Sequence, residues 1–181
     1  MNFRKFLTAF IVGIGVFLAA CTVQAQVAPS AFKSPISLTA GGMVSLFDQD
    51  YYPVKQWGAG AFVDLNLFHG IGVEAEGRWQ RFHEYQNISQ DNYLIGPRVK
   101  VLHIWRAQPY VKALGGFSNM NFGNGIGSGR FTTLAFGGGV DLRVTRRWAL
   151  RADGEYQYWP TFLDSHLTPY GVSAGVSYRI F

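Results

Sequence analysis

Hydrophobic and polar side chains alternate with a period of two along most of the chain after residue 35. The segment from Trp148 to Tyr158, WALRADGEYQY, shows the pattern clearly, because its charged residues occupy one parity and its large apolar residues the other. Successive side chains of a β-strand point to opposite faces, so this segment predicts a ribbon with one apolar and one charged face. No long segment follows the helical period, and we therefore expect an all-β chain.

The alternation divides into eight expected strands. They span residues 36–47, 57–67, 71–80, 93–102, 109–117, 132–144, 148–158 and 169–181. The connections between them alternate in length, and the longer, more polar ones are 48–56, 82–92, 118–131 and 159–168. Short turns at one end and long loops at the other are typical of outer-membrane barrels with an even number of strands. The pattern thus predicts an eight-stranded antiparallel up-and-down transmembrane β-barrel.

Thirteen charged residues fall within the expected strands, all at the parity opposite to the large apolar side chains. They are Asp64, Glu74, Glu76, Arg78, Arg98, Lys100, Lys112, Asp141, Arg143, Arg151, Asp153, Glu155 and Arg179. Six are acidic and seven are basic, so they can neutralise one another inside a narrow barrel. We interpret them as a structural network that fills the barrel. Arg81 would break the parity if the third strand ran longer, and it would then lie at the rim.

Period two alone does not decide which face is inside. A secreted lipocalin-like barrel would turn the apolar face inward and the charges to water. Aromatic residues near the strand ends favour the membrane barrel, because they can form two interfacial girdles. The outer girdle would hold Tyr51, Tyr52, Trp57, Trp79, Tyr93, Phe117, Tyr156, Tyr158 and Trp159, and the inner one Phe68, Trp105, Trp148 and Phe181.

Residues 1–25 resemble a secretory signal peptide. A short basic start is followed by an apolar run of about fifteen residues, too short to favour a spanning helix, and by a small-residue cleavage site ending at Ala25. Cys21 offers an alternative, because the residues before it also fit a lipoprotein signal in which this cysteine is lipidated. We expect 26–35 to be a flexible leader and 36–181 to form the barrel domain.

Composition excludes several kinds of chemistry after the signal. Cys21 is the only cysteine, so the mature barrel would have no disulfide and no thiol site. The four histidines, His69, His83, His103 and His166, lack metal-ligand spacing and fall in expected loops or turns. Asp164, Ser165 and His166 are adjacent, which seldom allows a catalytic relay. We expect no enzyme activity, no cofactor and no metal site, and the modest positive charge does not favour nucleic acid.

The closing strands resemble small outer-membrane β-barrels of the OmpA-like type. The resemblance is most specific in FGGGVDLRVTRRWALRADGEYQY, which ends at Tyr158, and in YGVSAGVSYRIF at the C-terminus. It implies that the barrel-assembly machinery reads the last strand, with Gly175, Tyr178 and Phe181 matching the signal. Phe181 is out of phase with Tyr178, which departs from the usual pattern. The chain stops where larger members continue, so we expect no peptidoglycan-binding domain.

These features predict an integral protein of the outer membrane of a Gram-negative bacterium. We expect a monomer in contact with outer-membrane lipid and lipopolysaccharide, with no nucleic-acid partner and with an extracellular ligand that the sequence does not identify. The barrel would be a scaffold for surface loops, whose aromatic residues Tyr51, Tyr52, Trp159 and Phe162 would mark the interface or take part in adhesion or recognition. The alternative is a porin-like narrow channel or transporter for a small solute.

Overall fold

The structure, a computed structural model, describes residues 36–49, 55–82, 88–121, 127–162 and 165–181. The proposed signal peptide, leader and cleavage site lie outside these residues, as do Tyr51, Tyr52 and His83. Within the described ranges, no helix has the length and apolar character needed to cross a membrane.

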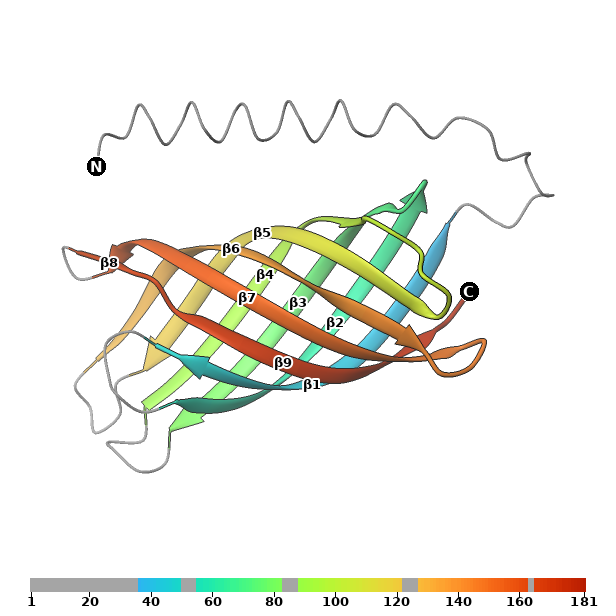
Figure 1. Ribbon diagram of the computed structural model, residues 1–181. Helices are drawn as coiled ribbons and strands as arrows, with labels where there is room; N and C mark the ends of the chain where they lie inside the picture. The colour runs from blue at the N-terminus through green and yellow to red at the C-terminus, as the bar shows by residue number, and fades with distance from the viewer. Residues whose placement is uncertain (1–35, 50–54, 83–87, 122–126, 163–164) are drawn as a thin grey trace. The chain divides into compact units, whose positions relative to one another are not determined.

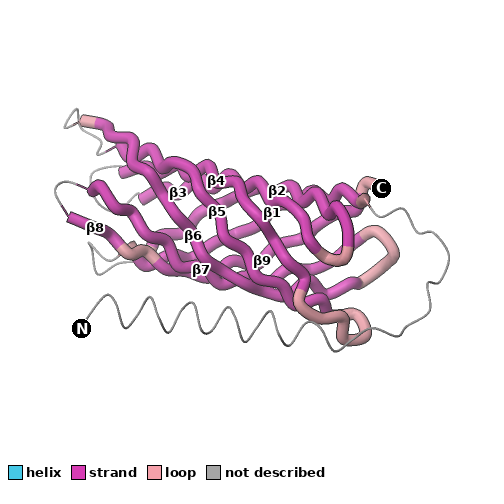
Figure 2. Tube along the Cα trace, turned by 90° about the horizontal axis from the view of Figure 1, so that it is seen from above, coloured by secondary structure: helices cyan, strands magenta, loops and turns pink. Residues whose placement is uncertain are grey.

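Eight long antiparallel strands close into a barrel, as the sequence predicts (Figure 1). The strands are β1 (Ser37–Asp48), β2 (Gln56–Phe68), β3 (Ile71–Phe82), β4 (Ile88–Lys100), β5 (Ala107–Asn121), β6 (Ser128–Arg143), β7 (Trp148–Phe162), the short β8 (Ser165–Leu167) and β9 (Tyr170–Arg179). Each long strand pairs with its neighbours in the chain, and β1 pairs with β9 to close the wall. Figure 2 shows the same wall from above, with most of the described turns at the end where the C-terminus lies.

Several strand ends differ from the predicted boundaries. Strands β4, β5, β6 and β7 extend by four or five residues into segments that the polar composition assigned to outer loops. The paired register explains this, because cross-strand backbone hydrogen bonds continue where the side chains no longer alternate between apolar and charged. The three-residue strand β8 pairs with the end of β7, and the sequence pattern had not indicated it.

Tight turns join the strands at the end where both β1 begins and β9 finishes. His69 and Gly70 both have positive φ values, of 50° and 83°, which two-residue hairpin turns of type I′ require. Trp105 also has a positive φ, of 52°, in the turn that the Ile104–Ala107 bridge closes. The start of β1 meets the C-terminal residue here, because the amide of Leu38 donates to the carbonyl of Phe181. We call this end the short-turn mouth.

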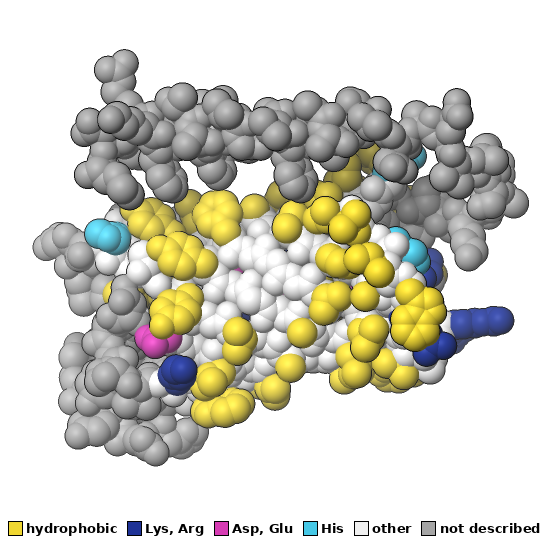
Figure 3. Space-filling model, in the orientation of Figure 1, with side chains coloured by type: hydrophobic (Ala, Val, Ile, Leu, Met, Phe, Trp, Pro, Cys, Tyr) yellow, Lys and Arg dark blue, Asp and Glu magenta, His cyan; other side chains and the backbone are white. Residues whose placement is uncertain are grey.

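The outward face is apolar between two rims. In Figure 3 the middle of the visible wall is hydrophobic or white, and the charged side chains lie at the two ends. The aromatic residues expected in the girdles, apart from Tyr51, Tyr52 and Trp159, are exposed on this face. Because the charged parity is buried and the apolar parity exposed, the lipocalin-like alternative is wrong.

Trp159 corrects the expected outer girdle. Its side chain is fully buried in the barrel, where its ring stacks on Phe131 with 5.9 Å between ring centroids. The reason is parity, because Trp159 shares the inward phase of Gln157 and Glu155 once β7 continues beyond Tyr158.

Arg81 lies at the outer rim of β3. The strand does run past the predicted end, and the Arg81 side chain is exposed and forms an ion pair with Asp91 of β4. Asp91 is a second charge on the outward face. The predicted set of strand charges did not include it, because β4 was expected to begin at Tyr93. Pairing at the rim gives both charges a partner where the cost of a lipid-facing charge is lowest.

Candidate functional site: the interior charge network

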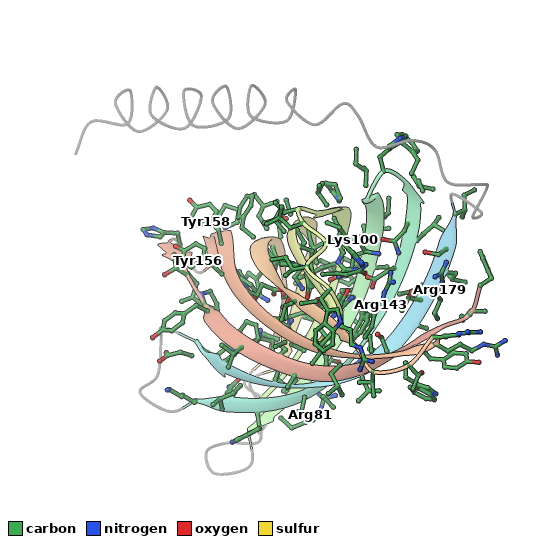
Figure 4. The ribbon with its side chains drawn as sticks, turned by 45° about the vertical axis from the view of Figure 1, so that its right-hand side comes forward. Arg81, Lys100, Arg143, Tyr156, Tyr158 and Arg179 are labelled. Carbon is green, nitrogen blue, oxygen red and sulfur yellow. The ribbon has the colours of Figure 1, made fainter. Side chains whose placement is uncertain are left out.

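Ten of the thirteen predicted charges have buried side chains inside the barrel. They are Asp64, Glu74, Glu76, Arg78, Arg98, Lys112, Asp141, Arg151, Asp153 and Glu155. The other three lie at the short-turn mouth, where Lys100 is partly buried and Arg143 and Arg179 are exposed. Figure 4 shows these three at one end of the barrel and Tyr156 and Tyr158 toward the other.

The layer nearest the mouth is built on two arginines. Arg151 of β7 contacts Asp64 at 2.5 Å, Asp141 at 2.9 Å and Glu74 at 3.0 Å. Arg98 of β4 contacts the same three carboxylates, at distances between 2.5 and 3.3 Å. Each carboxylate is thus shared between two guanidinium groups, and strands β2, β3, β4, β6 and β7 are joined across the lumen.

Lys112 of β5 occupies the centre of the network. Its Nζ atom lies 2.8 to 3.1 Å from one oxygen of each of four carboxylates, which belong to Glu74, Glu76, Asp153 and Glu155. Its side chain is only 2% exposed. The charge of this buried ammonium is therefore balanced by the carboxylates around it.

Arg78 forms the layer on the outer side of Lys112. It has 0% side-chain exposure, pairs with Glu76, and contacts Glu155 at 3.0 Å. Glu155 in turn accepts from Gln157 at 2.8 Å, and Gln157 accepts from the indole of Trp159 at 3.0 Å. A single hydrogen-bonded path therefore connects the ion pairs to the buried Trp159 near the outer end.

Aromatic rings and glycines hold the guanidinium groups in place. Arg151 lies 3.7 Å above the ring of Phe62, and that ring covers Gly41 on the neighbouring strand. Arg78 lies 4.2 Å above Phe47, whose ring similarly covers Gly171. A Cβ atom at either glycine would clash with the ring that covers it. Each ring is therefore packed between a glycine on one face and a guanidinium group on the other.

Tyr110 is part of the interior network, but the predicted set did not include it because that set contained only charged residues. Its ring contacts Arg98 at 3.7 Å, and its hydroxyl donates to Asp153 at 2.7 Å. Gly139 faces this hydroxyl, because a Cβ there would lie 2.8 Å from it. The inward parity of Tyr110, which precedes Lys112 by two residues, is the signal that could have identified it.

The outer half of the lumen is lined by amides, which the sequence interpretation had also left out. Gln49, Gln56, Gln80, Gln90, Asn92 and Gln157 are all buried there. Gln49 donates to both Gln56 and Gln80 at 3.1 Å. Beyond them, Met120, Trp159 and Leu167 form a small apolar cluster with Phe131 packed against it.

The predicted assembly residues lie on β9 and at its end. Gly175 faces inward against Met43, while Tyr178 packs on Trp148 with 4.9 Å between ring centroids. Phe181 is 58% exposed beyond the end of the strand. Gly175 thus faces the barrel interior, whereas Phe181 is exposed outside the strand. The role of these residues in assembly stays a prediction.

Residues considered for chemistry do not assemble into a site in the described structure. No group of histidine, cysteine and acidic residues suited to a metal occurs among the described residues. His69 lies in a turn and His103 in the connection after β4, as expected, whereas His166 lies in β8 and so corrects the expected loop. The side chains of Asp164 and Ser165 fall outside the described part, and the absence of catalysis remains an expectation.

Comparisons with known proteins agree with this architecture. The sequence pattern of the family described as outer membrane protein β-barrel domain matches residues 14–179. The fold is similar to Neisserial surface protein A, with a TM-score of 0.66 and 13% identity over 80% of this chain and 97% of that one. OprG from Pseudomonas aeruginosa follows with a TM-score of 0.59 and 12% identity over 83% and 98% of the two chains. The N-terminal barrel of OprF from the same organism has a TM-score of 0.55 and 15% identity over 78% and 97%. No curated protein matches the sequence.

Proposed function

Because the chain belongs to the outer membrane protein β-barrel domain family, we propose that it is a non-enzymatic integral barrel that supports recognition segments at the cell surface. The ion-paired interior carries this proposal. Ten buried charges from six strands contact one another across the lumen, which suits a rigid support better than an open pathway. Recognition would then belong to the four outer connections, since loops on a rigid scaffold commonly carry binding.

A surface-display experiment tests this role. Cells producing the protein are compared with cells producing a variant whose outer connections are replaced by glycine-serine segments of the same length. The replaced residues are 50–54, 83–87, 122–126 and 163–164. We expect both proteins to insert equally, and only the natural protein to raise attachment to immobilised extracellular-matrix proteins. Equal attachment by both kinds of cell would contradict recognition by these connections.

A narrow solute path is the second candidate. Gln49, Gln80, Gln90 and Asn92 each have a buried amide atom with no hydrogen-bond partner in the described part of the chain, which favours water in the outer half. The charge layers lie between this half and the mouth. Planar-bilayer recording decides between the two, because a rigid support produces no discrete conductance steps, whereas regular steps would support the channel.

A further inference from the structure

Basic residues dominate the short-turn mouth. They are Lys100, Arg106, Arg143, Arg146, Arg147 and Arg179. The acidic residues near them in the described structure are Asp64 and Asp141, and both already bind Arg98 and Arg151. Among the described residues, none of the six forms an ion pair with an acidic side chain, although Arg179 donates to the main-chain oxygen of Phe181 at 3.2 Å.

The positive charge at the mouth exceeds the amount that would neutralise the buried network. The buried network holds six acidic and four basic side chains, a formal charge of −2. Six cations at the mouth more than offset this excess, leaving four positive charges in the half of the barrel that ends there. The outer end differs, because its described charges, such as Arg81 and Asp91, are of both signs.

A cavity of about 60 Å³ lies at the mouth among these cations. Lys100, Arg143, Arg146, Arg147 and Arg179 line it, together with the hydroxyl-bearing side chains of strands β1 and β9 and of the β6–β7 turn. Asp64 and Asp141 also line its inner side, but both are already paired with Arg98 and Arg151. Backbone bonds hold the lining together, since the amide of Arg143 donates to the carbonyl of Arg106 and that of Arg179 to Arg147, at 2.9 and 2.7 Å. Guanidinium groups and hydroxyls around a small cavity suit a tetrahedral oxyanion.

Apolar side chains on the lipid-facing wall border this cavity. Trp148 lines it and packs on Tyr178, whose hydroxyl accepts from Arg147 at 2.8 Å. Ile180 and Phe181 are exposed on the same rim. Aromatic residues at a rim mark the level of lipid headgroups, so the cationic cavity opens at the depth where a headgroup phosphate lies.

We propose that the short-turn mouth binds a phosphate group, supplied by the headgroup of an anionic phospholipid in the adjacent leaflet. The phosphate occupies the cavity between Lys100, Arg143 and Arg179, and the acyl chains lie along Trp148 and Phe181. The site is independent of the recognition role of the outer connections.

Binding to purified protein in zwitterionic micelles tests this site. The titrants are dioctanoyl phosphatidylglycerol, dioctanoyl phosphatidylcholine and inorganic phosphate. One variant combines Lys100→Gln, Arg143→Gln and Arg179→Gln; a matched control combines Lys55→Gln, Arg81→Gln and Arg130→Gln at the outer end. We expect phosphatidylglycerol to bind at least about tenfold more tightly than phosphatidylcholine, and the mouth variant to lose at least about tenfold in affinity.

The control and a charge-preserving variant separate binding from folding. The outer variant should bind phosphatidylglycerol like the natural protein, and Arg143→Lys with Arg179→Lys should retain most of the affinity. Tight binding of inorganic phosphate at the same residues would support the oxyanion site with a soluble source instead of a lipid. The proposal is overturned if the folded mouth variant binds phosphatidylglycerol as the natural protein does, or if phosphatidylcholine binds equally well.

Discussion

Replacing Lys112 by methionine tests how far the interior network stabilises the barrel. The change keeps the length of the side chain but removes the cation that contacts four carboxylates at 2.8 to 3.1 Å. At an effective dielectric constant of ~20, each contact contributes roughly 5 kcal/mol of attraction. Desolvation and repulsion among the acids offset most of that sum, and removing one partner of a buried network costs about 3–5 kcal/mol of unfolding free energy.

Urea unfolding from lipid vesicles, followed by tryptophan fluorescence, measures this loss. Lys55→Met is the matched control, because Lys55 is exposed at the outer end, and its unfolding free energy should change by less than about 0.5 kcal/mol. Adding Glu76→Gln to Lys112→Met removes one of the carboxylates left without the ammonium, and should recover part of the loss. A stability change below about 1 kcal/mol for Lys112→Met would refute the reasoning, and so would strictly additive effects in the double variant.

Three further substitutions test separate parts of the structure. Ala152→Arg places a charge on the lipid-facing side of β7, midway between Trp148 and Tyr156, and should lower the unfolding free energy by ~2–4 kcal/mol, against ~0–1 for Thr132→Arg near the outer rim. Trp159→Ala should cost about 3–5 kcal/mol in the same unfolding assay, and an unchanged midpoint would contradict its burial. Gly139→Ala should cost about 1–3 kcal/mol, since its Cβ would collide with the backbone oxygen of Ala152; full stability would show that the wall adjusts freely.

Alternation predicted the strands, and the loop lengths and the aromatic residues near the strand ends turned that pattern into a membrane barrel. Once the wall is taken to meet lipid, the apolar parity of Leu150 and Val172 identifies the outward face. The same rule applied beyond Tyr158 would have placed Trp159 inside. The error arose because the aromatic residue was assigned by its type, near a strand end, and not by its phase.

The alternation of apolar and polar residues did not predict where the strands end at the outer rim. Where the outward face becomes polar, as at Asn119 and Asn121, the apolar-out alternation disappears although the backbone pairing continues. Polar residues such as Gln90 therefore look like loop residues in the sequence, yet they are buried in the outer half of the lumen.

The sequence by itself determined which residues share a face of each strand, because successive side chains in a strand alternate between the two faces. The tertiary structure alone decided which charges meet. Asp64 and Arg151 are 87 residues apart, and only closure of the barrel with its particular register brings their atoms within 2.5 Å. The same closure leaves Arg143 and Arg179 at the mouth without an acidic side chain as partner among the described residues, although their parity matches that of the buried charges. Position along the barrel axis, which a period-two pattern does not encode, separates charges that stabilise the interior from charges that remain available to a ligand.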